Sequence, residues 1–181
     1  LVAGDVSPLL VEQQQAVAQA LSERASMDLL AITGCDDAGC ADDAIDTIGS
    51  RAFRRPLDDS QHARLRTVYD VGAENGGYVN GMRLVTQALL MSPSFLYHVE
   101  PQDHVSASSG DIVPVEGLAL ASRLSYFVWG TSPDDALLAS AQAGELDSAE
   151  GLRNAAMRLL DDERAIDGFR AFYRQWLKIK L

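Results

Sequence analysis

The sequence predicts an all-α protein of two packed helical subdomains, with about seven to eight helices and no substantial sheet. Apolar residues recur three and four positions apart along most of the 181 residues, which is the period of an amphipathic helix. Residues that favour helix starts, mainly Ser and Asp, stand just ahead of these stretches. The one strand candidate, residues 111–115, is weakened by Pro114, which has no N–H to donate to a sheet.

The first two helices are predicted from their boundaries. A leading helix is expected from residue 7 to about residue 31, because Ser7 suits the cap position and Pro8 suits the first turn. A second helix is expected over residues 41–53. Pro56 ends it, because a proline pushes the preceding residue out of the helical conformation.

A capping pattern opens the next helix. Asp58 can accept a hydrogen bond from the first turn while Gln61 reaches back, which predicts a helix to about residue 73. Two glycines mark a turn, and a further helix is predicted over 78–91. Pro93 either kinks that helix or begins a short one. The residues expected to be buried on these helices are Leu65, Val68, Tyr69, Val79, Met82, Val85 and Leu89.

The second half follows a serine-rich stretch, 101–113, which is the best linker candidate. A helix is predicted over 115–129. The next is expected to begin with Ser132 as its cap and Pro133 in its first turn, and to stop at Gly144.

The last two helices are predicted from a cap and from periodicity. Ser148 is expected to cap a helix that reaches about residue 160. The final helix is expected to begin near Glu163, and the regular spacing of its apolar residues indicates core packing. Those residues are Ile166, Phe169, Phe172, Tyr173, Trp176 and Leu177.

These patterns suggest three parts. Residues 1–30 are interpreted as the tail of a preceding domain or a leading helix. Residues 31–105 form the first helical domain, and 106–181 form the second, which we expect to be truncated at its C-terminal end.

Composition limits the partners. A share of 47% apolar and 23% charged residues is typical of a soluble globular protein. The formal net charge of −11 disfavours nucleic acid and anionic membranes, because phosphate binding needs clustered Lys and Arg. No apolar run approaches the roughly 20 residues of a membrane span, so membrane insertion is not expected.

Two cysteines, Cys35 and Cys40, stand in a short glycine-containing stretch. Such a loop can bring the two sulfurs within disulfide reach. A metal site would need further Cys or His ligands nearby, and the sequence around them has none. A structural disulfide is therefore favoured over two free thiols, and it implies an oxidising compartment, periplasmic or extracellular.

Several motifs together resemble a known family. The first half contains FRRPL and an SPSFLYHVE ending, and the second contains LASRLSYFVW, a PDD start, an RLLDDERA segment and a QWL ending. They are similar to a pair of adjacent helical domains of unknown function from large secreted proteins of planctomycetes, myxobacteria and some marine bacteria, the planctomycete cytochrome-C-associated domain family. The resemblance implies a secreted, all-helical protein, often beside cytochrome c modules, and supplies no catalytic residues.

The sequence departs from that pattern at two places. His98 stands where the family usually has arginine, so that an ion pair there would depend on pH. The given residues stop after the QWL element, where longer members continue into further helical domains and sometimes a haem module.

Three arginines, Arg51, Arg54 and Arg55, crowd around one predicted helix end. They could bind an anionic group through paired N–H bonds, and Arg55 is kept as a ligand-binding candidate. The favoured interpretation is structural, because arginines complement the negative end of a helix and pair with carboxylates such as Glu100 or Asp134.

Two further candidates lie in the second half. Arg123 interrupts an apolar helix face, which predicts a buried or half-buried ion pair with Asp134 or Asp135. Trp129 stands beside a turn glycine and could stack on a sugar ring, although core packing is the usual role of such a residue.

No metal or cofactor site is expected on this chain. The acidic loop around Asp37 and Asp42 lacks the order of an EF-hand and its closing glutamate. The three histidines, His62, His98 and His104, lie on different elements without helical pairing, so haem is expected only on neighbouring domains.

The sequence therefore predicts a non-catalytic helical module of a larger secreted or periplasmic protein. Its expected partners are neighbouring domains or a partner chain, and fold-level analogy places it in an oxidative or electron-transfer assembly. The alternative is part of an enzyme or carbohydrate-handling protein, with a cleft between the halves near Arg55, His98, Arg123 and Trp129.

Overall fold

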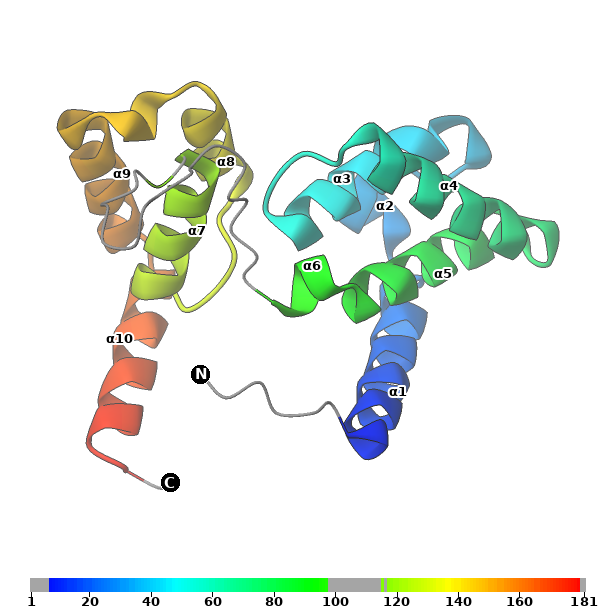
Figure 1. The fold of residues 1–181 in the computed structure, drawn as a ribbon, viewed down its shortest axis with the longest axis horizontal. Coiled ribbons are helices and arrows are strands. Elements are labelled where there is room, and N and C mark those ends of the chain that lie inside the picture. Colours follow the sequence, from blue (N-terminus) through cyan, green and yellow to red (C-terminus); the bar gives the residue numbers. More distant parts are fainter. Residues whose placement is uncertain (1–6, 98–114, 116, 180–181) are drawn as a thin grey trace, which may run out of the picture. The chain divides into compact units, whose positions relative to one another are not determined.

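The computed structural model describes residues 7–97, 115 and 117–179, and within these residues it is all-α, without a strand (Figure 1). The elements are α1 (Pro8–Ala25), α2 (Leu29–Thr33), η1 (Ala38–Cys40), α3 (Ala41–Phe53), α4 (Asp59–Glu74), α5 (Gly77–Met91), α6 (Pro93–Leu96), α7 (Gly117–Val128), α8 (Asp135–Gln142), η2 (Glu145–Asp147), α9 (Ala149–Asp161) and α10 (Arg164–Trp176). The chain divides into two units, unit 1 (Leu1–Val99) and unit 2 (Glu100–Leu181). The all-α prediction is confirmed.

Unit 1 is built around α5, against which α1, α3 and α4 pack. The axes of α4 and α5 approach closely because glycines face each other: a Cβ on Gly72 would lie 2.9 Å from the Cα of Gly81. Any side chain there would therefore separate the two helices. The most deeply buried residues of this core are Cys35, Ala41, Ala44, Ile45, Tyr69, Met82, Val85 and Leu89.

Most local predictions for unit 1 are confirmed, and two are wrong. The predicted helix 41–53 is α3, and the Asp58 capping box opens α4. The leading helix, however, ends at Ala25, because the hydroxyl of Ser26 bonds a helical carbonyl at 2.7 Å and the chain then leaves the helical conformation. Val79 is 50% exposed, and its neighbour Tyr78 is the buried one.

Unit 2 is built around α7, which contacts α8, η2, α9 and α10. Helix α10 comes close to the end of α7 because Gly168 has no side chain; a Cβ there would collide with the carbonyl of Val128. The buried apolar core consists of Ala121, Val128, Trp129, Leu137, Ala141, Leu146, Leu159 and Ala165.

The predicted start of α8 is wrong by two residues. Asp134, not Ser132, is the cap: its backbone is extended and its carboxylate accepts a hydrogen bond from the Leu137 N–H at 2.9 Å. The Leu138 N–H donates to the Asp134 carbonyl at 3.0 Å as the first hydrogen bond of the helix, so α8 begins after Asp134 and Pro133 precedes it. Ser148 caps α9 as predicted.

The predicted core packing of the last helix is also wrong. In Figure 1, α10 begins beside one end of α7 and α9 and continues away from both. Ala165 is its only buried residue. Its large apolar residues are at least half exposed, and these are Ile166, Phe169, Phe172, Tyr173 and Trp176, which we call the α10 apolar face.

Candidate functional site

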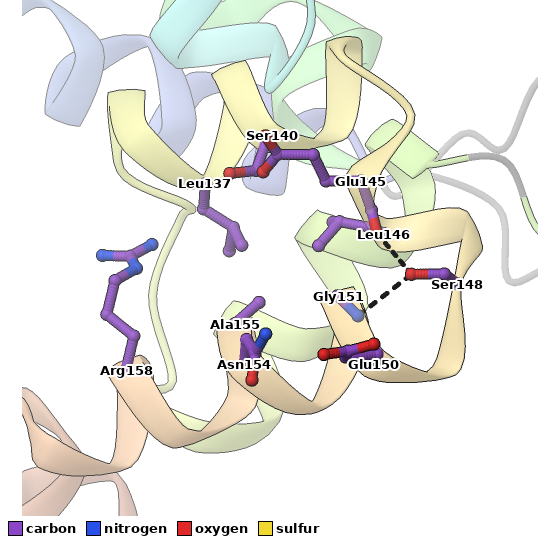
Figure 2. A pocket seen from close by; sticks show the side chains of 10 residues that line it. All are labelled: Leu137, Ser140, Glu145, Leu146, Ser148, Glu150, Gly151, Asn154, Ala155 and Arg158. Atoms are coloured by element: carbon purple, nitrogen blue, oxygen red, sulfur yellow. Dashed lines mark hydrogen bonds between the residues drawn. The ribbon is translucent and has the colours of Figure 1, made fainter.

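A pocket of about 470 Å³ lies between α8, η2 and α9 in unit 2 (Figure 2). Helix α8 and η2 place Leu137 and Leu146 on one side, and α9 places Asn154 and Ala155 on the other. Its remaining lining residues are Ser140, Glu145, Ser148, Glu150, Gly151 and Arg158. The pocket is therefore apolar at its base, with polar groups around it.

The hydroxyl in this pocket has a structural role. Ser148 Oγ accepts a hydrogen bond from the Gly151 N–H at 3.0 Å and donates to the Glu145 carbonyl at 3.3 Å, as Figure 2 shows. It thereby satisfies a backbone N–H in the first turn of α9. Among the residues that line the pocket there is no histidine to act as a base toward this hydroxyl. The pocket thus offers hydrogen bonds without an activated nucleophile.

Arg158, at the edge of the pocket, holds Asp134 through two hydrogen bonds. Its Nη1 and Nη2 atoms donate to the two carboxylate oxygens at 2.9 and 3.0 Å. These bonds lower the pKa of Asp134 below its usual value and raise the pKa of Arg158. A second arginine, Arg164, donates to the same carboxylate at 3.4 Å. The start of α8 is in this way tied to the ends of α9 and α10.

Arg164 extends this arrangement to the core. It donates to Asp162 at 2.7 and 2.8 Å, which lowers the pKa of Asp162 to about 2. Its guanidinium lies 3.5 Å from the ring centroid of Trp129, and the Trp129 indole N–H donates to the Leu159 carbonyl at 2.8 Å. We call Asp134, Arg158, Asp162, Arg164 and Trp129 the Asp134 cluster; it joins residues from the ends of α7, α8, α9 and α10.

The site residues predicted from the sequence have different structural roles. Trp129 is only 4% exposed and is covered by Arg164, so it is a core residue rather than an open stacking surface. Arg55, in unit 1, is half-buried and donates to the Pro56 carbonyl at 3.2 Å. His98 lies outside the described residues, as does Glu100.

The expected burial of Arg123 is wrong. Its side chain is exposed and lines an apolar groove of about 600 Å³ between α7 and α9. Arg153 lines the same groove from α9. A guanidinium at the edge of a groove stays hydrated while the aliphatic part of its side chain covers apolar surface. The charge therefore does not lose its hydration on folding.

Sequence reasoning missed the role of Arg54. This residue is buried, ends α3 in a left-handed conformation, and donates to the carbonyls of Ser94, Tyr97 and Phe95 at 2.8, 3.2 and 3.4 Å. It satisfies backbone acceptors around the short helix α6, so that among the described residues its partners are carbonyl groups. Glu100, an expected partner of this cluster of arginines, lies outside the described residues.

The cysteine prediction is confirmed. Cys35 and Cys40 form a disulfide with a Cα–Cα distance of 5.9 Å. The neighbouring carboxylates are engaged locally: Asp37 accepts from the Gly39 N–H at 2.6 Å, and Asp42 pairs with Arg66 at 2.8 Å. Within the described residues, no group of three acidic, histidine or cysteine side chains could hold a metal ion.

Comparison with known proteins finds two adjacent family matches. Residues 40–100 match PSD5, a protein of unknown function (DUF1595), and residues 115–181 match PSD4, a protein of unknown function (DUF1592). Searches of curated proteins and of solved structures found no match. In the part of the chain that the structure describes, no helix has both the length and the apolar character of a membrane span.

Proposed function

Because the chain belongs to the family of these paired helical domains, the planctomycete cytochrome-C-associated type, we propose that it is a non-catalytic structural and interaction module of a larger secreted or periplasmic protein. One observation carries the proposal: the α10 apolar face lies in solvent in unit 2. When an ordered helix carries aromatic residues along one face, another helix, domain or chain normally covers that face.

The energetics of α10 support a missing partner. It has 13 residues, and isolated helices shorter than about 12–15 residues are marginal in water. Gly168 and several aromatic residues lower its helix propensity further. Because packing against the rest of unit 2 is concentrated at the start of α10, around Ala165 and Gly168, the remainder gains stability chiefly by burying the apolar face elsewhere, against a neighbouring domain or a partner chain.

The site chemistry supports a role without catalysis. The charged residues of the Asp134 cluster form hydrogen bonds with one another, and the Ser148 hydroxyl in the pocket caps helix α9. The disulfide supports an oxidising compartment. The family resemblance supports an oxidative or electron-transfer assembly in which any haem lies on neighbouring domains.

Hydroxyl-radical footprinting tests the interaction role. Oxidation of Phe172 and Trp176 is measured on the isolated chain and in the periplasm of the native host. We expect several-fold protection in the native host, with the highly exposed Met27 of unit 1 as a reactive reference. Equal oxidation of both aromatic residues in the two settings would contradict the proposal.

The cofactor part has its own test. The assembly is purified from the native host and cleaved with a protease, and haem absorbance is followed across the separated fragments. We expect haem, where present, on fragments other than those that contain residues 1–181. A Soret band that stays with this segment would refute that part of the proposal and leave the interaction role intact.

A further inference from the structure

Charge is distributed unevenly along this chain. Residues 164–181 contain five of its 15 basic residues and one of its 26 acidic residues. This segment therefore carries a net charge of +4, whereas residues 1–163, with ten basic and 25 acidic residues, carry −15. The segment contains α10, so the helix with the exposed apolar face is also the basic element of an acidic protein.

The basic residues edge the apolar face. Arg170 lies four residues after Ile166 of that face, and Arg174 lies four residues after Arg170, so that the two arginines follow one side of the face along the helix. Both are exposed, and Lys178 continues the series. Arg170 pairs with Asp167 at 3.2 Å, whereas Arg174 and Lys178 form no ion pair with the described residues.

Aromatic rings of the α10 apolar face pack against one another. The Phe172 ring lies 5.4 Å from Tyr173 and 6.0 Å from Trp176, measured between centroids. Rigid aromatic clusters with adjacent arginines are the usual centres of protein interfaces, because they bury a large area at a small cost in side-chain entropy. Trp176 is 67% exposed, so this area is available to a partner.

We propose that α10 docks onto an acidic amphipathic helix of a partner chain or neighbouring domain, whose apolar stripe is bordered by Asp and Glu. The inference rests on the proposed function and specifies the chemistry of the partner. A helix-in-groove or helix-on-helix contact buries the aromatic side chains, and carboxylates along its border meet Arg170 and Arg174.

Two other occupants fit the charges less well. A second copy of α10 would place arginines beside arginines along the contact, and like charges across an interface are destabilising. An anionic membrane would attract α10 but repel residues 1–163, which carry −15. An acidic protein surface matches both the apolar face and its border.

The first test uses the native host and two paired variants. Arg170→Glu with Arg174→Glu reverses the border, and Arg170→Lys with Arg174→Lys keeps it. We expect Trp176 to lose its protection from oxidation in the first variant and keep it in the second. If both variants stay protected, the acidic partner is refuted while the interaction role stands. If Trp176 of the unaltered protein is unprotected, the proposed function itself fails.

The second test uses defined probes with the full chain. One synthetic amphipathic helix carries Leu and Phe on one face with Glu at its borders, and its match carries Lys instead of Glu. Binding is followed by the fluorescence of Trp176, with Trp176→Phe as the control for the buried Trp129. We expect the Glu peptide to bind roughly ten-fold more tightly, and the preference to invert in the Arg170→Glu, Arg174→Glu variant.

Two results of the second test would overturn the proposal. Equal affinity for the two peptides would mean that the border charges do not select the partner. A shift of Trp176 fluorescence with phosphatidylglycerol vesicles, combined with no preference between the peptides, would assign the face to a membrane surface. Circular dichroism of both arginine variants checks that the helical content is unchanged.

Discussion

Removal of the Asp134 carboxylate is expected to destabilise unit 2 more than its position near the surface suggests. Asp134→Ala deletes the cap of α8, which contributes about 1 kcal/mol. It also deletes the two hydrogen bonds from Arg158, and bonds to charged groups contribute about 1.5–3 kcal/mol. The side chain is 25% exposed, so water replaces part of this loss, and we expect a total of about 2–3 kcal/mol.

Asp134→Asn separates the two contributions. Asparagine caps a helix about as well as aspartate but cannot form the ion pair, so this variant is expected to lose roughly half as much stability as the alanine variant.

The assay is urea unfolding followed by tryptophan fluorescence. Both tryptophans, Trp129 and Trp176, belong to unit 2, so the signal reports this unit separately from unit 1. A loss below about 0.5 kcal/mol for Asp134→Ala would refute a stabilising role of the cluster. Equal losses for the alanine and asparagine variants would instead show that the cap contributes nothing.

Four further outcomes are expected. The pKa of Asp162 is lowered from 3.8 to about 2, so as the pH falls this carboxylate is protonated in the unfolded chain before it is protonated in the folded one. An acid titration of tryptophan fluorescence should therefore show unit 2 losing stability between about pH 4 and pH 2, and constant stability over this range would contradict the expectation. Arg54→Ala removes the side-chain donor from the part-buried carbonyls of Ser94 and Tyr97 and should cost unit 1 about 2–4 kcal/mol in thermal unfolding followed by tyrosine circular dichroism, with Arg54→Lys recovering less than half. Reduction of the Cys35–Cys40 disulfide should lower the stability of unit 1 by about 2 kcal/mol and leave the tryptophan transition of unit 2 unchanged, which reductant titration checks. Gly168→Ala should destabilise unit 2 by about 1–3 kcal/mol in the urea assay, because the new methyl group meets backbone; an unchanged midpoint would mean that α10 can shift freely.

Features that act within one helical turn were predictable from the sequence. The Asp58 capping box, the Ser148 cap and the short helix begun by Pro93 all lie where their side chains predict. The disulfide also follows from local spacing, because a short loop keeps the two cysteines close. Errors arose where two suitable caps compete within three residues, as at Ser132 and Asp134.

The candidate site was less predictable, because its residues acquire their roles from distant partners. The Asp134 cluster joins side chains up to 35 residues apart, from Trp129 to Arg164. Arg123 and Arg54 illustrate this: burial was expected for Arg123, which is exposed, whereas Arg54 was grouped with the other arginines of a helix end and is itself buried. Sequence spacing does not tell which carbonyl or carboxylate will lie within reach of a long side chain.

The sequence by itself determined that this protein is helical, where most helices begin and end, and that its two cysteines pair, because those outcomes depend on interactions between near neighbours. Only the tertiary structure decided which apolar faces are covered. The stripes of α4 and α10 have the same period, yet Leu65 and Tyr69 are buried while Phe169 and Trp176 are exposed. Periodicity shows that a helix has an apolar face, and burial depends on whether another element packs against it.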